Sequence, residues 1–327
     1  MLHMLPFIHT NIIWFLGILL AFGAGMFFSG QWQQFKQDET SSQAKEYRES
    51  GYAFINPLLE CEYIDNQGNS KLTTLKDTVE KLIAKKNNQH VSLYYRDLLN
   101  GPWYGYKEDE SFSPQSLLKL PIIFAYLKIA DENPGVLSQE ILYEGDYNSN
   151  LDETENLKKG ESYPVEMLIS RTIQESDNVA FGLLVNHLPL KFVEKVHQDL
   201  NIPYPDKSTP EDFVSVKSYS SIFRVLYNAS YLSRSNSEFL LQLLSSSDFK
   251  QGLVAGVPDS VIVAHKYGIK NPSDEDPTSQ LHDCGIVYHP KHPYLVCIMT
   301  KGTDQKEQTA TIKELSEAVY NVIDSEK

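Results

Sequence analysis

A serine and a lysine three residues apart, Ser116 and Lys119, could act together as a nucleophile and its base. They open an apolar run that continues to Tyr126, and such a run predicts a buried helix. Residues three apart share one face of a helix, so the hydroxyl and the amine are expected to lie side by side. A serine hydroxyl is a poor nucleophile at neutral pH and needs a base. The sequence therefore predicts Ser116 as a nucleophile and Lys119 as its base.

The residues before this pair predict how the helix begins. Ser113 is a good N-cap, because its hydroxyl can accept a hydrogen bond from an unpaired amide of the first turn. Pro114 then takes the first helical position, where a missing N–H is tolerated. Ser116 is therefore expected in the first turn, near the positive end of the helix dipole. The same Ser-x-x-Lys spacing also starts at Ser42 and at Ser247, in polar surroundings, so the spacing alone is not specific.

Two more polar motifs follow, each beside a predicted buried element. A Ser-Asp-Asn triplet at residues 176–178 separates two apolar segments, 165–173 and 179–185, that predict helices. Taken alone, this triplet is explained at least as well by helix capping, because all three residue types cap well. A Lys-Tyr-Gly triplet at residues 266–268 follows a predicted strand at residues 261–264. Each motif thus adjoins an element that would hold it in place.

In this order, the three motifs resemble those of the penicillin-recognising serine enzymes, which are the class A β-lactamases and the peptidoglycan transpeptidases and carboxypeptidases. The segment at residues 283–288 also resembles part of the sheet of class A-like serine hydrolases. The resemblance covers about residues 52–327 in outline. It implies an α/β (α+β) fold, with an antiparallel sheet flanked by helices and a second, all-helical lobe.

The resemblance assigns roles to single residues. Ser116 is implied to be the nucleophile and Lys119 its base, whose pKa burial and the nearby Lys266 cation would lower. Ser176 is implied to relay a proton to the leaving nitrogen, and Asn178 to hold the substrate amide. These assignments predict an acyl-enzyme mechanism.

The third motif is implied to line the substrate site, through Lys266, Tyr267, Gly268 and Ile269. The backbone N–H groups of Ser116 and Ile269 are implied to form the oxyanion hole, where one donor is typically worth ~3–4 kcal/mol in the transition state. Tyr267 departs from the family, which has a small Thr or Ser at this place to help bind the substrate carboxylate. Its hydroxyl lies much farther from the backbone, so this sequence is not expected to bind that carboxylate in the usual way.

A second departure concerns deacylation. Class A β-lactamases activate the deacylating water with a glutamate in a Glu-x-x-Leu-Asn pattern, and residues 179–265 contain no such pattern. The segment at residues 201–208 looks shorter, and Glu166 lies upstream of the Ser-Asp-Asn triplet. Glu211 and Asp212 are better explained as acids of a helix first turn. Acylation is therefore better supported than fast deacylation.

Strands are expected near both ends of the domain and helices in its middle. The expected strands are residues 91–96, 103–106, 261–264, 283–288 and 294–300, and the helices that flank them are 75–86 and 312–322. This order favours one antiparallel sheet built from both ends of the chain, with the terminal helices on one face. The domain of residues 52–327 thus divides into a sheet lobe (52–113 and 251–327) and a helical lobe (114–250).

The N-terminus predicts a membrane anchor. The first 35 residues contain no Lys, Arg, Asp or Glu, and residues 12–28 are all apolar or glycine. A spanning helix needs ~17–25 residues. A signal peptide would have a basic start and a small-residue cleavage site, so one uncleaved transmembrane helix within residues 1–30 is favoured. The polar residues 31–51 predict a flexible tether. The basic residues after the span would place the domain in the cytoplasm, whereas the implied substrates place it outside.

Composition excludes several classes of function. The chain has 327 residues, of which 41% are hydrophobic, and its net charge of −14 argues against a nucleic-acid partner. Its three cysteines lack the spacing of a zinc site, and neither a metal nor a cofactor is expected. Cys284 and Cys297 lie on adjacent expected strands and are interpreted as buried free thiols.

The leading interpretation is a membrane-anchored serine hydrolase that acylates Ser116 with β-lactams or with D-alanyl peptides of peptidoglycan. The expected location is a bacterial cell membrane, with a single span and the domain outside the cytoplasm. One alternative is a weak or inactive penicillin-binding or cell-wall sensor, which Tyr267 and the missing glutamate favour. Another is a hydrolase for an unrelated ester or amide. The oligomeric state stays open.

Overall fold

The computed structural model describes residues 42–48, 50–65, 70–86, 89–99, 101–145 and 157–325. The membrane anchor expected within residues 1–30 lies outside these residues. In the described part, no helix is both long enough and apolar enough to cross a membrane. The described residues within 44–62 and 69–327 belong to one compact unit, which contains the Ser116 motif, the Ser-Asp-Asn triplet and the Lys-Tyr-Gly triplet.

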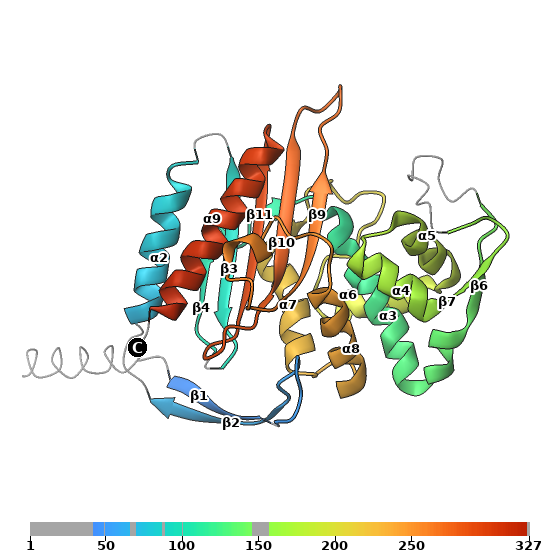
Figure 1. Ribbon diagram of the computed structural model, residues 1–327, viewed down its shortest axis with the longest axis horizontal. Coiled ribbons are helices and arrows are strands. Elements are labelled where there is room, and N and C mark those ends of the chain that lie inside the picture. Colours follow the sequence, from blue (N-terminus) through green and yellow to red (C-terminus); the bar gives the residue numbers. More distant parts are fainter. Residues whose placement is uncertain are drawn as a thin grey trace, which may run out of the picture. The chain divides into compact units, whose positions relative to one another are not determined.

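A five-stranded antiparallel sheet with the strand order β4-β3-β11-β10-β9 is the centre of this unit (Figure 1). Its strands are β3 (His90–Asp97), β4 (Trp103–Tyr106), β9 (Val263–Lys270), β10 (Ser279–Val287) and β11 (Tyr294–Gly302). The sheet therefore combines an early and a late part of the chain, which confirms the prediction. Because β9 is 263–270, the Lys-Tyr-Gly motif lies inside the strand and not after it.

Short strand pairs lie outside this sheet. They are β1 (Ser42–Arg48) with β2 (Leu58–Asp65), β5 (Ser111–Phe112) with β8 (Val214–Ser215), and β6 (Glu140–Leu142) with β7 (Ser162–Pro164). β1 lies entirely within residues 31–51, which the composition predicted to be a flexible tether, so residues 42–48 differ from that prediction. The β5–β8 pair joins the chain just before the Ser116 motif to the start of a later helix.

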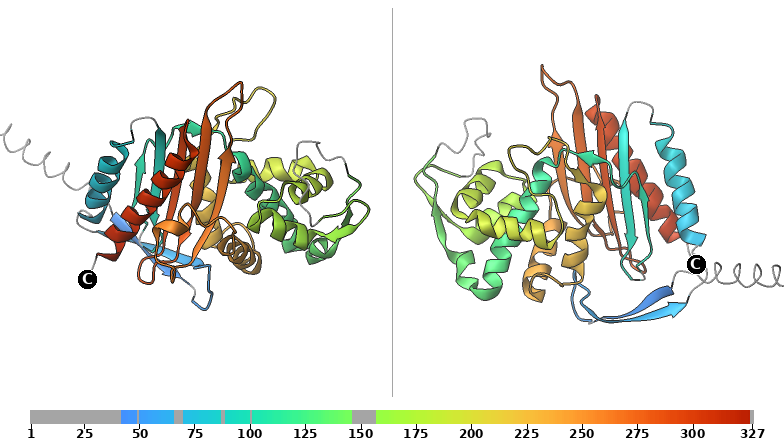
Figure 2. Two further views of the ribbon diagram at one scale, coloured as in Figure 1. Left: turned by 45° about the horizontal axis from the view of Figure 1, so that its top comes forward. Right: turned by 180° about the vertical axis from the view of Figure 1, so that it is seen from behind.

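Helices cover both faces of the sheet. The α-helices are α2 (Ser70–Ile83), α3 (Lys119–Glu132), α4 (Val165–Gln174), α5 (Asn178–His187), α6 (Leu190–Asp199), α7 (Val216–Tyr227), α8 (Arg234–Ser245) and α9 (Gln305–Asp324), and the 3-10 helices are η1 (Gln115–Leu118), η2 (Pro134–Ser138) and η3 (Val254–Gly256). As predicted, the terminal helices α2 and α9 share one face, and α7 lies on the other (Figure 2). All nine residues of β10 are buried, because both faces of this central strand are covered.

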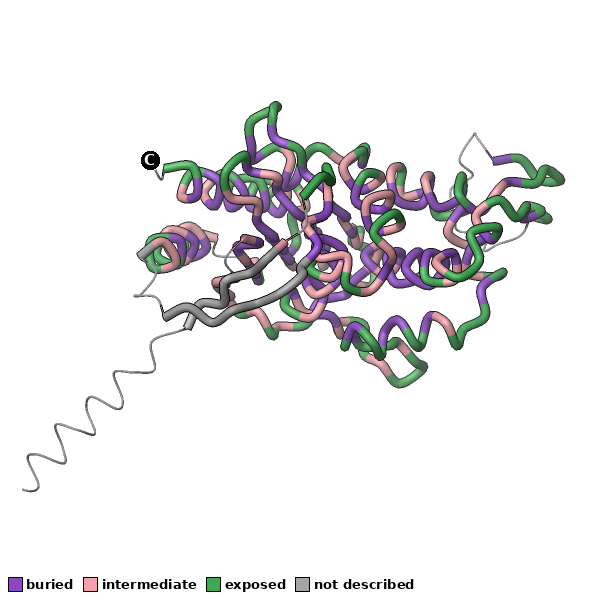
Figure 3. The backbone as a smooth tube through the Cα atoms, turned by 90° about the horizontal axis from the view of Figure 1, so that it is seen from below, coloured by how far each residue is buried: buried purple, intermediate pink, exposed green. Residues whose placement is uncertain are grey.

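Two apolar cores result, one on each face of the sheet. The smaller core packs α2 and α9 against the sheet, and the larger one extends from the other face through the helical lobe. Purple, buried segments accordingly run through the strands and the facing sides of the helices in Figure 3. Because the larger core includes residues of both lobes, the lobes do not have separate interiors.

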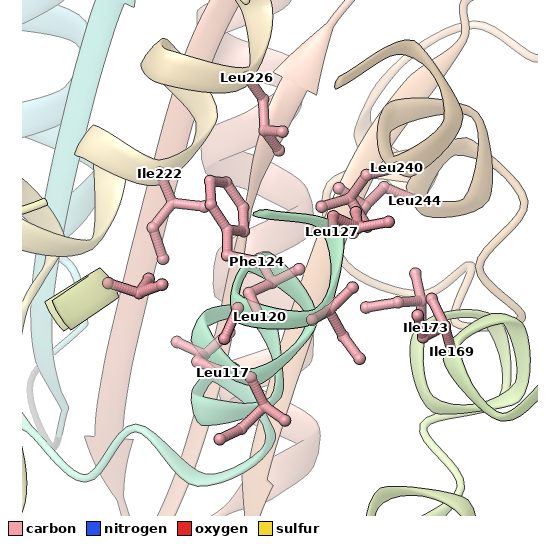
Figure 4. Packing of buried hydrophobic residues seen from close by; sticks show 14 of the residues in the cluster. Leu117, Leu120, Phe124, Leu127, Ile169, Ile173, Ile222, Leu226, Leu240 and Leu244 are labelled. Carbon is pink, nitrogen blue, oxygen red and sulfur yellow. The ribbon is translucent and has the colours of Figure 1, made fainter. Parts of the chain in front are cut away.

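Helix α3 lies at the centre of the larger core. Its residues from Lys119 to Leu127 are all buried, so this part of the helix is enclosed on every side. Phe124 and Leu127 lie among side chains of α7, α4 and α8 in Figure 4. This packing fixes the segment that carries Ser116 and Lys119.

The cysteines differ from expectation. Cys284 and Cys297 are opposite each other in the β10–β11 register and form a disulfide, so the interpretation as free thiols was wrong. Adjacent antiparallel strands place facing residues about 4.5–5.5 Å apart, so two facing cysteines are near enough to bond. Sequence reasoning had found the adjacency, but composition alone did not show whether the thiols pair.

Candidate active site

Ser116 lies in the 3-10 turn η1, immediately before α3. The expected cap was wrong: the N-cap residue is Pro114, and the Ser113 hydroxyl accepts a hydrogen bond from Gln115 Nε2 at 2.7 Å. Gln115 has a φ of +49°, a conformation that side chains other than glycine rarely adopt. The chain therefore turns sharply just before Ser116 and enters the buried helix at Lys119.

Side chains of β10 hold this turn from the sheet. Gln280 Oε1 accepts from the Ser113 backbone N–H at 3.0 Å, and His282 Nε2 lies 2.9 Å from the Ser113 carbonyl oxygen. Burial lowers the pKa of His282 to about 4, so the ring is neutral at pH 7 and Nε2 must carry its proton to donate this bond. Gln280 also donates to Asp212, which pairs with Lys301 at 2.7 Å. These bonds set the position of η1.

Gly268 lets β9 approach η1. A Cβ at this position would lie 2.8 Å from the Pro114 carbonyl oxygen and 3.3 Å from Leu117 Cγ. The glycine of the third motif is thus required by a close approach of two backbones. Ile269, the next residue, lines the same cleft as Ser116, at the free edge of the sheet.

Replacing Gly268 by alanine is expected to push η1 away from β9. Overpacking of this kind typically destabilises a protein by about 1–3 kcal/mol, and it would misplace Ser116 relative to Ile269. We expect both a lower unfolding midpoint and slower acylation of Ser116, measured by denaturation and by stopped-flow labelling. Gly160→Ala, at a site with open space around its Cβ but a φ of +88°, is a control for backbone strain without displacement of η1. Normal acylation in Gly268→Ala would contradict this role.

Lys119 is 3% exposed and donates to three oxygens of the Ser-Asp-Asn motif. Its Nζ lies 2.5 Å from the Ser176 carbonyl oxygen, 3.1 Å from Ser176 Oγ and 2.7 Å from Asn178 Oδ1. As an ammonium, Lys119 can donate to all three oxygens; after losing one proton, it keeps two N–H groups for the carbonyl and amide oxygens, which only accept. Its lone pair is then left for a hydroxyl. The Ser116 hydroxyl has no hydrogen-bond partner in the described part of the chain, and it lines the same cleft.

Burial lowers the pKa of Lys119 to about 8, although the Asp177 carboxylate acts in the opposite direction. Lys266 is fully buried, and its pKa is also lowered, first by burial and then by the charge of Lys119. The expectation that Lys266 lowers the pKa of Lys119 was wrong, because the charge of Lys119 instead lowers the pKa of Lys266. For Lys119, burial is the cause of the lowered pKa.

Ser176 joins the two lysines. Its Oγ accepts from Lys266 Nζ at 2.9 Å and from Lys119 Nζ at 3.1 Å, and its backbone has a φ of +57°. Burial raises the pKa of Tyr267, and the Ser176 side chain acts in the opposite direction. A hydroxyl between two amines can pass a proton from one to the other, which suits the expected relay role.

Asp177, the middle residue of the motif, is structural. Its Oδ1 accepts from the backbone N–H groups of Val179 and Ala180, which makes it the N-cap of α5. Its Oδ2 accepts from Arg171 Nε at 2.9 Å and Nη2 at 2.7 Å. The capping interpretation of this triplet is thus right for Asp177, while Ser176 and Asn178 contact the lysine. The two interpretations apply to different residues of one motif.

Tyr267 lies over Lys266. Its ring stacks on Phe249, with centroids 4.2 Å apart and an interplanar angle of 20°. Lys266 Nζ lies 4.4 Å from the centroid of the Tyr267 ring. The ring therefore lies over the Lys266 amine, which in its ammonium form would attract an anionic group of a ligand.

The cleft beside Ser116 has a volume of about 910 Å³. Four of the predicted site residues line it, namely Ser116, Lys119, Asn178 and Ile269. Ser176 and Lys266 connect to it through Lys119, and Gly268 packs on η1. The structure thus brings all the predicted site residues together. Within its described residues, no group of three or more His, Cys, Asp or Glu side chains could hold a metal ion.

The acids near the cleft are already engaged. Glu211 lines the cleft and forms an ion pair with Lys270 at 2.6 Å. Asp206 also lines it and accepts from Ser208 and Thr209 of its own loop. Asp212 is held by Lys301, as described above, and belongs to the support of η1. Each of these three carboxylates therefore already has a partner, and none is left unpaired to activate a water molecule.

Sequence reasoning missed the supporting residues. Phe249, Gln280, His282 and the buried pair of His265 Nδ1 and Asp283 Oδ1, 2.7 Å apart, were not singled out. One signal was available, because polar residues recur within a strand whose apolar neighbours predict full burial. Buried polar groups need partners, so such residues indicate a network.

Comparisons with known proteins agree with this geometry. The sequence model of the beta-lactamase enzyme family matches residues 74–323. The chain is similar to the extended-spectrum beta-lactamase PER-1 of Pseudomonas aeruginosa, with 22% identity over 80% of this chain and 92% of that protein.

Solved structures share the fold. A class A beta-lactamase from Bacteroides cellulosilyticus matches with a TM-score of 0.71 and 17% identity. The match covers 79% of this chain and 100% of that one. A variant of PBP-A, solved as an acyl-enzyme complex with penicillin G, matches with a TM-score of 0.67 and 22% identity. That match covers 77% of this chain and 97% of the other.

Proposed function

Because this chain belongs to the beta-lactamase enzyme family, we propose that it is a serine hydrolase that forms an acyl-enzyme at Ser116 with β-lactams or with D-alanyl peptides of peptidoglycan. The observation that carries this proposal is Lys119, a buried amine with a pKa lowered to about 8, in the same cleft as Ser116. Such an amine is a base near neutral pH. The PBP-A variant with bound penicillin G supports the choice of ligand.

Acylation follows from the groups around the cleft. Neutral Lys119 takes the proton of Ser116 as its Oγ attacks the carbonyl carbon, and the carbonyl oxygen becomes an oxyanion next to the N–H groups of Ser116 and Ile269. When the C–N bond breaks, Ser176 gives its proton to the leaving nitrogen. Ser176 then regains a proton from the ammonium group of Lys119 or Lys266, both of which contact its Oγ.

Deacylation is proposed to be slow. It requires a base for the attacking water, and the carboxylates of the cleft, Asp206 and Glu211, are engaged by their own loop and by Lys270. Asp212 supports η1 and is bound to Lys301. A persistent acyl-enzyme favours a penicillin-binding or D,D-carboxypeptidase-like enzyme over an efficient β-lactamase.

One observation favours the alternative of a binding or sensor domain. The Tyr267 ring covers Lys266, and Phe249 stacks on the ring and holds it there. A substrate carboxylate that depends on Lys266 would meet the ring first. In this alternative the chain binds a cell-wall ligand without turnover.

Intact-mass spectrometry of the full chain with penicillin G separates these functions. A stable adduct that peptide mapping places on Ser116, and not on Ser42 or Ser247 of the other two Ser-x-x-Lys copies, is the expected result. Penicillin consumed without a lasting adduct would contradict slow deacylation. If penicillin G neither forms an adduct nor is consumed, the proposal that the chain is an enzyme acting on β-lactams is contradicted. The variant Tyr267→Thr then tests the alternative: labelling gained by it would identify the ring as the obstacle.

We also propose that the domain lies outside the cytoplasm, on a single membrane span. The apolar stretch at residues 12–28 supports the span. The Cys284–Cys297 disulfide supports an oxidising compartment, because disulfides are rare in the cytoplasm. The substrates named above are extracytoplasmic as well.

Thiol counting tests this location. The protein is extracted from membranes and denatured in excess iodoacetamide, without a reductant. Of the three cysteines, only Cys61 is then expected to be alkylated, because Cys284 and Cys297 form a disulfide. Reduction before alkylation should add two further groups. Alkylation of all three cysteines without reductant would mean that the thiols are free in the cell, and it would contradict the oxidising location.

A further inference from the structure

Two adjoining cavities lie where α7 packs on the β3–β4 end of the sheet. One has a volume of about 250 Å³ and includes Arg48, and the other has a volume of about 290 Å³ and includes Lys217. Arg96 of β3 and Arg224 of α7 line both cavities. We call these two cavities, joined at Arg96 and Arg224, the basic groove.

The basic groove gathers positive charge in an acidic protein. The whole chain has a net charge of −14, yet four cations and only one acid line the groove. That acid, Asp97, is 4% exposed and accepts from the backbone N–H of Leu99 at 2.8 Å. Like charges repel at short range, so this arrangement is not the one that stability alone would favour.

The two shared arginines have no partner within the described residues. Neither Arg96 nor Arg224 makes a side-chain hydrogen bond or an ion pair there, although acids are abundant in the chain. By contrast, Lys217 pairs with Asp109 at 3.3 Å, and Arg48 donates to the Asn56 carbonyl oxygen and to a neighbouring amide. The charge that is free for a ligand is thus on the two guanidinium groups.

The remaining walls suit a ligand larger than a simple ion. The Trp103 ring is 44% exposed, stacks on Tyr94 at a centroid distance of 5.6 Å, and lies beside Lys217. An exposed aromatic face next to guanidinium groups can contact the organic part of an anionic molecule. A phosphate group has three or more acceptor oxygens, enough for two guanidinium forks at once.

We propose that the basic groove is a binding site for a phosphate group of an organic or inorganic ligand. The site is separate from the proposed chemistry. In the strand order β4-β3-β11-β10-β9, the groove lies at the β4 end and the cleft of Ser116 at the β9 end. Figure 2 (right) shows α7 over the face of the sheet that α2 and α9 do not cover. Binding in the groove can therefore be measured without acylation of Ser116.

Calorimetric titration of the full chain in a mild nonionic detergent tests this site. The probes are inorganic pyrophosphate and glycerophosphoglycerol, a soluble phosphodiester with the headgroup chemistry of an anionic lipid. We expect binding of at least one probe, weakened about tenfold in the double variant Arg96→Gln/Arg224→Gln, because charge-assisted bonds to phosphate are lost. Tighter binding of the diester indicates a lipid headgroup, and tighter binding of pyrophosphate indicates a free phosphate compound.

A charge-matched control distinguishes binding in the basic groove from a general effect of the protein's net charge. The double variant Lys191→Gln/Lys313→Gln removes the same charge from exposed positions on α6 and α9. It should change the affinity less than twofold. The proposal is overturned if neither probe binds at millimolar concentration, or if both double variants weaken binding equally.

Discussion

Replacing Lys119 by alanine is expected to lower the rate of Ser116 acylation by penicillin G by about 10²–10⁴-fold, the usual contribution of general base catalysis. Lys119 is the buried amine that shares the cleft with Ser116. Its removal leaves the Ser116 hydroxyl without a group that can take its proton. Stopped-flow labelling or time-resolved intact-mass measurements give the rate.

Two variants control this result. Lys119→Arg keeps a cation but supplies no base, because a guanidinium does not deprotonate in proteins, so it should be as slow as the alanine variant. Lys128→Ala removes an exposed lysine of the same helix, whose Nζ donates to the Tyr231 carbonyl oxygen, and should acylate normally. Normal acylation in Lys119→Ala, with an unchanged unfolding midpoint, would exclude Lys119 as the base.

The pH profile gives an independent check on the same group. Only neutral Lys119 can accept the proton, and burial places its pKa at about 8. Below that pH the acylation rate should fall about tenfold for each pH unit, and above it the rate should level off. A base with the ordinary pKa of lysine would give a rate that still rises near pH 10. A flat profile between pH 6 and 8 would contradict the role of Lys119.

The sequence was most informative where neighbouring residues determine the outcome. The apolar run after Ser116 predicts the buried helix α3, because burial on all sides leaves no polar face in the sequence. The hairpin of β10 and β11 follows from two apolar strands joined by a short turn, and the structure confirms it. The three motifs lie close together because each one begins or interrupts such an element.

Contacts between distant residues were beyond sequence reasoning. The Ser113 backbone is held by Gln280 and His282, which lie 167 and 169 residues later in the chain. No local pattern indicates that these strand residues, and not the Ser113 hydroxyl, support the start of η1. The same reason explains Phe249, whose ring holds Tyr267 over Lys266. Such partners depend on strand register and side-chain direction, which one sequence does not specify.

Replacing Asp177 by alanine is expected to lower the free energy of unfolding by about 3–5 kcal/mol, the usual effect of removing one partner of a buried ion pair. Asp177 is 3% exposed and binds Arg171 through two hydrogen bonds. The variant leaves Arg171 with Glu175 alone, and it exposes two amides at the start of α5. Chemical denaturation, compared at the same slope, measures the loss.

Asp304 provides a matched control. It caps α9 through the amides of Lys306 and Glu307, but it is exposed and lacks a buried cation. Asp304→Ala should therefore cost only about 1 kcal/mol, which is typical of a lost N-cap. The difference between the two variants measures the buried pair of Arg171 and Asp177. Equal losses would mean that capping alone explains the role of Asp177.

The variant Asp177→Asn connects this structural residue to the chemistry. Asparagine keeps a capping oxygen but removes the negative charge that raises the pKa of Lys119. Without that charge, the ammonium form of Lys119 is less stable and its pKa falls below about 8. The midpoint of the acylation profile should therefore move to lower pH, so that the variant acylates faster than the wild type at pH 6, provided that Asn178 and Ser176 keep their places. A midpoint at higher pH, or an unmoved one in a folded variant, would show that the Asp177 charge does not act on the base.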